Sequence, residues 1–470
     1  MTYKPLAQKQ TEDMLEELPR DYTHLSDSVD TLKELRTDRL RAMLYYAKSF
    51  SPWYKKQLAN LDVEYFTEED LYKIPTLDKV TLMNNWDEIV TDRRLSLKLV
   101  EKHLETINRD ENELYLLDRY HTITTSGTSS FRGIFIYDWD EWNRFYIYLI
   151  RYGLRYKDRS LILENKETIK IAIVNISNPI FATYSLHKTF IFDDAEKFHL
   201  PINLPIAEIV KGLNEAEVDV IIGLPPTIRQ LCQEARLNHL HIQPKIIITF
   251  GEPLHLPIRH LIQETWPEVS VFNTLSSSEG LIGINCHANS HEIHLNDDGC
   301  IVELFDKENK PIGKNRLSSK SYLTNLYNFT LPLIRYELSE QLLFLDKICG
   351  CGSNHQLVAE PLYRPEFDFT YRNGILVHHS VFDTPLLLEK NLREYQVLQT
   401  QNGVDVKIVT IGEVDKSRLK QRIISELCKI GLSAPTVNII EIDAFEYPSS
   451  GKLRRFLRYT KEESQSFVAS

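Results

Sequence analysis

The spacing of apolar residues predicts two kinds of structure along the chain. Leucine and methionine recur at helical spacing over residues 31–50, and Ser51-Pro52 ends the pattern, so we predict an amphipathic helix there. The first 25 residues are polar, and we predict a loosely held segment. After residue 120 four apolar runs indicate buried strands, namely KIAIVNIS, VDVIIGLPP, PKIIITFGE and VSVFNTLSSSE. Amphipathic segments separate these runs, which is typical of a mostly parallel sheet with ligands at its carboxyl edge.

The pattern changes twice more toward the C-terminus. Short β signals separated by turn residues follow one another over residues 291–346, which predicts antiparallel strands. After residue 364 the pattern is that of two strands, a helix and a last strand, as in a small α+β unit. We therefore predict an α/β protein. It has a large multi-layer α/β N-terminal domain, residues 1–363, and a small α+β C-terminal domain, residues 364–470.

The composition narrows the function classes. The 66 acidic residues outnumber the 55 basic ones, for a net charge of −11, which argues against a nucleic-acid partner. No stretch is long and apolar enough to span a bilayer, so we expect no membrane partner. The N-terminus has no apolar leader, and six cysteines are too few for a disulfide scaffold. We expect a cytoplasmic protein.

Two segments of small residues are candidates for nucleotide contacts. Residues 124–130, TTSGTSS, place hydroxyls around Gly127, and such a loop can wrap phosphate oxygens. Taken alone, an ordinary surface loop explains this segment better. Thr249–Pro253 directly follows a strand, and Gly251 would let the backbone approach a flat ligand. A plain β-turn is the simpler explanation of that segment by itself.

Three further segments carry charge. Glu279 lies among hydroxyls in NTLSSSEG, where a carboxylate could hold Mg²⁺ near phosphates, although a helix cap has the same composition. Pro332–Gln341 combines an arginine with two glutamates. Near the C-terminus, SSGKLRR puts Lys452 on a short loop, from which a mobile cation could reach a developing anion. A solvated basic turn is the alternative for that loop.

The order of these segments is more specific than any one of them. Over nearly its whole length the chain resembles the adenylate-forming superfamily, and most of all its branch of phenylacetate–CoA ligases. The segments that carry the resemblance are RTDRLRAMLYYAKSFSPWYKKQL, IPTLDKVTL, TTSGTSSFRG, FGEP, NTLSSSEG, TNLYNFTLPLIRYELSEQ and SSGKLRRF. The resemblance implies an adenylate-forming fold and a two-step reaction. ATP first activates a carboxylic acid as an acyl-adenylate, and a nucleophile, usually the thiol of CoA, then takes the acyl group.

The resemblance also implies roles for single residues. Lys452 would bridge the α-phosphate and the acyl oxygen, and Glu279 would help to hold Mg²⁺, so these two are the candidate catalytic residues. The candidate ATP-binding residues are Thr125, Ser126, Gly127, Thr128 and Ser129 at the β,γ-phosphates, Gly251, Glu252, Pro253 and Ser278 on the adenine side, and Glu340 and Arg335 at the ribose. The C-terminal domain would rotate between the two steps.

Two positions depart from the family pattern in ways that bear on catalysis. The phosphate loop continues as Ser130-Phe131-Arg132, without the usual second glycine and lysine, and Arg132 could supply the lost charge. The usual ribose aspartate is Glu340, which is one methylene longer. These departures leave a non-catalytic homologue that binds nucleotide as an alternative to an active ligase.

A separate candidate metal site consists of Cys286, His294, Cys349 and Cys351. Three thiols and one imidazole match the donor set of a closed tetrahedral zinc site, and the Cys-Gly-Cys knuckle can present two thiolates together. Relatives in the resembled branch carry a Cys/His zinc site in this region. Reduced, partly buried thiols are the alternative, and His287 and His291 are rival ligands. We expect a structural zinc ion.

The acyl pocket is expected between strand-end loops that precede the adenine segment. Its candidate residues are Tyr184, His187, Gly223 and Pro225, and ordinary core and turn packing explains them equally well. Apolar walls would suit an aromatic or alkyl acid. CoA is the first expectation for the acceptor, and an amine or the thiol of a carrier protein is the alternative. The expected cofactors are ATP, Mg²⁺, zinc and CoA.

Overall fold

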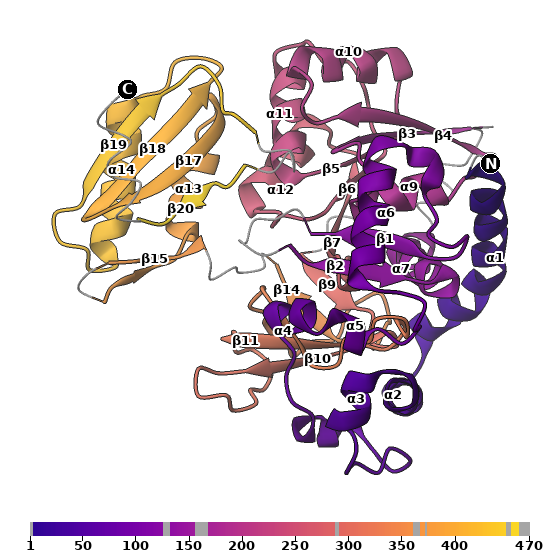
Figure 1. Ribbon diagram of the computed structural model, residues 1–470. Helices are drawn as coiled ribbons and strands as arrows, with labels where there is room; N and C mark the ends of the chain where they lie inside the picture. The colour runs from indigo at the N-terminus through magenta and orange to yellow at the C-terminus, as the bar shows by residue number, and fades with distance from the viewer. Residues whose placement is uncertain are drawn as a thin grey trace.

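The computed structural model describes residues 3–125, 132–155, 168–286, 291–360, 367–371, 374–447 and 453–459. Figure 1 shows a large N-terminal domain and, to one side of it, a smaller C-terminal domain. The predicted α/β class with these two unequal domains is confirmed. The predicted boundary between residues 363 and 364 falls outside the described residues.

The N-terminal domain is built around a nine-stranded sheet whose halves differ in strand direction. Neighbouring strands from β4 to β7 are parallel, and those from β7 to β13 are antiparallel. In spatial order the strands are β13 (Phe344–Leu345), β14 (Leu357–Ala359), β9 (Glu292–Leu295), β8 (Gly280–Ile284), β7 (Ser270–Ser277), β6 (Ile246–Thr249), β5 (Val220–Gly223), β3 (Ile169–Asn175) and β4 (Ala195–Pro201).

The four apolar runs form β3, β5, β6 and β7, as predicted. The sequence analysis missed β4, whose residues are only half-buried or exposed, because an edge strand needs no continuous apolar run. Helices α10 (Ile206–Ala216), α11 (Pro225–Arg236) and α12 (Leu256–Thr265) pack their apolar faces on the parallel half and form one core with it. Figure 1 shows these three helices beside β3, β5 and β6.

A second, larger core joins the N-terminal helices to the rest of this domain. Helix α2 (Val29–Phe50) covers the predicted helix and begins two residues earlier, where Ser28 caps it by accepting a hydrogen bond from the Thr31 amide at 3.1 Å. The remaining helices here are η1 (His24–Ser26), α3 (Pro52–Gln57), η2 (Glu68–Lys73), α4 (Lys79–Asn84), α5 (Trp86–Ile89), α6 (Leu97–Arg109), η3 (Glu111–Glu113), α7 (Trp139–Arg155) and α9 (Ala182–Thr189).

The prediction of a loosely held N-terminal segment is wrong. Residues Lys4–Thr23 form helix α1, which packs along α7. Its buried face combines Ala7 and Met14 with polar residues that find partners there. Gln10 hydrogen-bonds the Trp139 carbonyl at 3.0 Å, and Asp21 pairs with Arg144 at 2.6 Å. The polar composition therefore reflects a buried hydrogen-bonded contact rather than exposure to water.

Two smaller sheets complete the N-terminal domain. Strands β10 (Cys300–Phe305), β11 (Lys320–Asn325) and β12 (Tyr336–Leu338) pair antiparallel, as the sequence predicts for residues 291–346. Strands β1 (His121–Thr124) and β2 (Ile134–Tyr137) form an antiparallel pair on either side of the predicted phosphate loop.

The C-terminal domain has a core of its own. Its four-stranded sheet has the order β19 (Thr436–Glu441), β18 (Gly403–Thr410), β17 (Leu392–Thr400) and β20 (Phe456–Leu457). Helices α13 (Ser380–Leu387) and α14 (Lys416–Lys429) contribute to this core, and β15 (Phe369–Thr370) pairs with β16 (Leu376–Val377). In the described part of the chain, no helix has both the length and the apolar character needed to cross a membrane.

Candidate active site

A cavity of about 590 Å³ opens at the carboxyl ends of the parallel strands. Asn175 from β3, Ile222 from β5, Ile248 from β6 and Thr274 from β7 all line it. This edge is where the sequence predicts ligand binding, because the loops that leave parallel strands converge there. Helices α7 and α9 supply further walls.

The ends of the predicted phosphate loop lie at this cavity. The Thr125 amide donates to the Gly133 carbonyl, and the Gly133 amide donates to the Thr125 hydroxyl, both at 3.0 Å. Thr125 lines the cavity. Arg132, the proposed substitute for the missing lysine, donates to the Thr124 hydroxyl at 2.6 Å. Ser126, Gly127, Thr128 and Ser129 lie outside the described residues.

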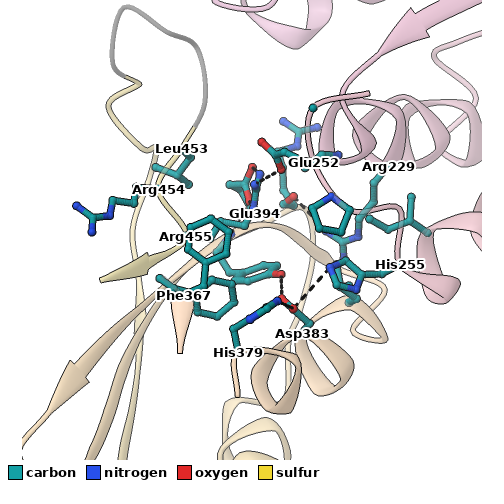
Figure 2. Close-up of a pocket in the computed structure, with 18 residues that line it drawn as sticks. Arg229, Glu252, His255, Phe367, His379, Asp383, Glu394, Leu453, Arg454 and Arg455 are labelled. Carbon is teal, nitrogen blue, oxygen red and sulfur yellow. Dashed lines mark hydrogen bonds and ion pairs between the residues drawn. The ribbon is translucent and has the colours of Figure 1, made fainter. Parts of the chain in front are cut away.

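The adenine-side residues line two neighbouring spaces, and Gly251 borders both. Gly251 and Ser278 line the large cavity, and Gly251 has a φ of 71°, a left-handed conformation that favours glycine. Glu252 and Pro253 line a smaller pocket of about 90 Å³ between the two domains, shown in Figure 2. The Glu252 carboxylate is therefore engaged at the domain interface.

Glu279 is a buried carboxylate on the cavity wall. It accepts a hydrogen bond from the Tyr336 hydroxyl at 3.0 Å. Burial and the Glu279 carboxylate raise the pKa of Tyr336, so the phenol stays protonated and donates. Sequence reasoning missed Tyr336 as the group that orients Glu279, although it lies within the predicted ribose segment.

The two ribose candidates have different surroundings. Glu340 is buried and lines the cavity. The Arg335 guanidinium instead donates to Glu303 at 2.9 Å and to the Ile74 carbonyl at 2.8 Å. It also lies against the Phe305 ring, and Arg335 is not among the described residues that line the cavity. Its contacts tie the start of β12 to β10.

Two basic residues that were not predicted as site residues line the cavity. Lys79, at the start of α4, lines it, and so does Arg454 of the C-terminal domain. Lys452 lies outside the described residues, but Arg454 follows it by two positions. Lys79 belongs to IPTLDKVTL, which the sequence analysis used only to support the resemblance, so its presence here was not predicted.

A partly buried ion-pair network joins the two domains beside the cavity (Figure 2). Arg455 donates to Glu252 at 2.6 Å and holds both oxygens of Glu394, at 3.1 and 3.0 Å. Burial works against the charge of Arg455, but the two carboxylates outweigh it and raise the pKa of Arg455. Arg229 of α11 adds hydrogen bonds to the Glu389 and Arg393 carbonyls, at 3.0 and 3.1 Å.

The four predicted metal ligands form one cluster. Cys286 and Cys349 have their sulfurs 3.4 Å apart, and the Cys351 sulfur is 3.4 Å from His294 Nε2. All four ligand atoms lie within 4.8 Å of one another. His294 Nδ1 contacts the His355 carbonyl at 3.1 Å, which leaves Nε2 facing the sulfurs. His291 is not part of the cluster, and His287 lies outside the described residues.

These donors fit a tetrahedral zinc ion. Three sulfurs and one imidazole are a usual structural set, and their separations suit zinc–sulfur bonds of about 2.3 Å. A hydrogen bond from the Cys286 thiol lowers the pKa of Cys351, which favours the thiolate that binds zinc. The carbonyl behind His294 is the kind of partner that orients a metal-binding imidazole.

The four acyl-pocket candidates have different surroundings. His187 lines the large cavity from α9. The Tyr184 hydroxyl instead donates to Glu111 at 3.0 Å. Tyr184, Gly223 and Pro225 are not among the described residues that line this cavity. Their assignment to the acyl pocket stays a prediction.

Comparison with known proteins identifies the class of fold. No family model matches the chain. The structure of 2-hydroxyisobutyryl-CoA ligase in its postadenylation state matches with a TM-score of 0.71 and 14% identity, covering 96% of this chain and 93% of that one. The same ligase in its thioesterification state gives a TM-score of 0.57 and 16% identity, over 96% and 94% of the two chains. The predicted adenylate-forming fold is therefore confirmed.

A curated relative matches in sequence over a shorter span. It is the indoleacetate–lysine synthetase of Pseudomonas savastanoi, which is 24% identical over 168 residues. The match covers 33% of this chain and 42% of the relative.

Proposed function

We propose that this protein is an AMP-forming ligase that activates a carboxylic acid as an acyl-adenylate. The observation that carries the proposal is the convergence of Thr125, Glu279, Glu340 and Arg454 on one cavity at the strand ends. A hydroxyl at the phosphate loop, two carboxylates and a cation from a second domain are the groups that a nucleoside triphosphate and its metal ion require. The acid would occupy the apolar part of the same cavity.

In the first step, a carboxylate oxygen of the acid would attack the α-phosphorus and pyrophosphate would leave. Glu279 offers a carboxylate held by Tyr336 for Mg²⁺, and Glu340 offers one for the ribose hydroxyls. Lys79 can supply the positive charge that the phosphate loop lacks, because it lines the same cavity. Mg²⁺, when bound, would neutralise charge on the phosphates.

Lys452 is the proposed cation at the α-phosphate. Support comes from Arg454, which follows Lys452 by two residues and lines the cavity. The next residue, Arg455, holds this segment at the domain interface through its bond to Glu252. The C-terminal domain would then move away so that the acceptor can reach the adenylate carbonyl. The higher TM-score for the postadenylation form of the related fold supports an arrangement of the domains close to that form.

In the second step, a nucleophile would attack the acyl carbonyl and AMP would leave. CoA is the first candidate, since the structural relatives described above are forms of a CoA ligase. An amine is the second candidate, because the curated sequence relative is named for joining indoleacetate to lysine. A carrier-protein thiol is a third acceptor of the same chemistry. Membership of the phenylacetate–CoA ligase branch is part of this proposal.

The Cys286 cluster would hold one structural zinc ion. The proposal rests on the four converging donor atoms, none of which belongs to a residue that lines the cavity. A closed set of four protein ligands leaves no position for substrate, so the ion would stabilise the fold around β8, β9 and the Cys349 knuckle.

Pyrophosphate release with ATP, Mg²⁺ and a panel of aryl and alkyl acids tests the proposed activity. We expect acid-dependent release, and mass spectrometry of reactions with CoA or amino acids will identify the acceptor. The Lys452→Ala protein is the matched control for contaminating activity. A nucleotide-dependent rise in melting temperature without pyrophosphate release from any acid would instead support the non-catalytic homologue.

A further inference from the structure

The wall that α9 presents to the cavity is mostly apolar, and its polar residues are Thr183 and His187. Phe181, Ala182 and Leu186 line the cavity, together with Phe145 and Leu149 from α7. Ile222, Ile248 and Leu281 extend this apolar surface. His187 also lines the cavity and is only 7% exposed. A titratable ring is thus set into a mostly apolar wall.

The His187 ring is incompletely satisfied by the protein. Its Nδ1 is buried and has no hydrogen-bond partner among the described residues. Another buried histidine, His103, shows the usual situation, with one nitrogen against the Thr122 hydroxyl and the other against the Glu113 carbonyl, both at 2.8 Å. Because Nδ1 has almost no exposed surface, a ligand in the cavity would reach the ring through its other nitrogen, Nε2, for which the described residues supply no hydrogen bond.

The backbone around His187 is held in place. The Lys197 ammonium donates to the His187 carbonyl at 3.1 Å and also to the Phe190 carbonyl, which fixes the last turn of α9. Burial, with the nearby Lys197 and His199, lowers the pKa of His187 well below its usual value. The imidazole is therefore neutral at pH 7, with one donor and one acceptor nitrogen.

His187 lies away from the phosphate loop along α9. The Thr124 amide donates to the Ile180 carbonyl at 2.9 Å, so the segment just before α9 adjoins the strand that leads into the phosphate loop. His187 is six residues beyond Phe181, or about 9 Å along the helix axis at 1.5 Å per residue. Thr183, one turn before His187 on the same helix face, adds a hydroxyl to the cavity wall.

We propose that the acid substrate carries one uncharged hydrogen-bonding group, such as a hydroxyl or a ring N–H, at the end remote from its carboxylate, and that His187 recognises it. This inference rests on the proposed function and specifies its substrate class. A purely hydrocarbon acid would leave the imidazole unpaired. A second charge on the acid would enter an apolar wall where a neutral imidazole cannot balance it.

Matched pairs of acids test this inference. The probes are 4-hydroxyphenylacetate against phenylacetate, and indole-3-acetate against 1-naphthylacetate, each compared by kcat/KM for pyrophosphate release. The same acids, coupled to sulfamoyl adenosine as stable adenylate mimics, give dissociation constants by calorimetry without any turnover. In at least one pair we expect the member with the hydrogen-bonding group to be favoured by about 10–100-fold in both measurements.

Substitutions at His187 assign the preference to this side chain. His187→Leu should reduce the preference to about threefold or less, while His187→Gln, which keeps a donor and an acceptor, should retain most of it. His199→Leu is the matched control, because His199 also has an unpartnered Nδ1 but is not among the cavity residues, and it should preserve the preference. Melting temperatures verify that each variant is folded.

Two results would overturn the inference. One is a wild-type protein that binds both members of each pair equally, or the hydrocarbon member better. The other is a folded His187→Leu protein that keeps the full preference. A lack of pyrophosphate release from every acid would contradict the proposed function alone, since the dissociation constants of the mimics still decide the role of His187.

Discussion

Arg455 of the C-terminal domain and Glu252 of the loop after β6 form a partly buried ion pair, with 2.6 Å between Nη1 and Oε2. Arg455 is three residues beyond Lys452, and Glu252 directly follows Gly251, which lines the cavity. The pair therefore couples the segment of the proposed catalytic lysine to the nucleotide side of the cavity in this arrangement of the domains (Figure 2).

Replacing Arg455 with Met should impair adenylation more than acyl transfer. The change leaves Glu252 and Glu394 without their shared cation at the interface, so the arrangement seen here loses stability relative to others. We expect pyrophosphate release to fall by about 10–100-fold, consistent with a loss of about 1.4–3 kcal/mol. Transfer from a preformed adenylate, measured separately, should change by less than about threefold.

A control for Arg455→Met is Lys416→Ala, which removes an ion pair with Glu441 on the surface of the same domain. Both half-reactions should stay near the wild-type rate in that variant. Equal losses in the two half-reactions of Arg455→Met would contradict a role in one arrangement of the domains.

Lys452→Ala should lower kcat for adenylation by about 10²–10³, because one preorganised cation at the developing charge is lost. Substrate affinities should change far less. Single-turnover pyrophosphate release measures the effect, with Lys429→Ala as the comparison, since Lys429 pairs with Glu426 on the surface of α14. Acyl-adenylate formation at the normal rate would refute the role of Lys452.

Lys79→Ala should raise the KM for ATP by about tenfold, equivalent to about 1.4 kcal/mol of lost interaction with phosphate. Lys79 lines the cavity, whereas Lys73 lies nearby in sequence and pairs with Asp70 on the surface. Lys73→Ala should therefore leave the KM for ATP unchanged. An unaltered KM in Lys79→Ala would show that another group balances the phosphates.

Protein purified without chelator should contain one zinc per chain by metal analysis. Cys349→Ser should lower both the metal content and the melting temperature, because structural zinc binding contributes directly to folding. Cys428→Ser is the control, since Cys428 is exposed and lies outside the cluster. A fully folded wild-type protein without metal would contradict this prediction.

The free energy of unfolding should depend on pH through Lys197. Burial lowers the pKa of Lys197 to about 8, whereas an unfolded lysine has a pKa of about 10.4. Between these values the unfolded chain binds more protons, so the stability of the wild-type protein relative to Lys197→Met should rise with pH by up to about 1.4 kcal/mol per unit. Chemical denaturation of both proteins at pH 7.5, 9 and 10.5 measures this difference, and a flat difference would contradict it.

The strands of the parallel half could be predicted because their signal is local. Each of the four apolar runs is buried by its own neighbours in the sheet, so its composition alone reveals it. The position of the cavity could then be predicted from the strands, since parallel strands bring their carboxyl ends together at one edge of the sheet. The residue types of the metal cluster could be predicted from the sequence, but their meeting depends on the tertiary structure. Strand β9 pairs with β14 through His294 and Leu357, and this pairing brings Cys286 and His294 to the Cys349 knuckle.

The sequence by itself determined the fold class, the strand-end site and the residue types available for its chemistry. Only the tertiary structure decided that Arg335 pairs with Glu303, that Glu252 pairs with Arg455, and that the polar helix α1 packs against the rest of the N-terminal domain. The physical reason is the range of the interactions. Apolar periodicity is set by residues a few positions apart, whereas the partner of a charge depends on segments that the chain path brings together from 32 to 203 residues away in these two pairs.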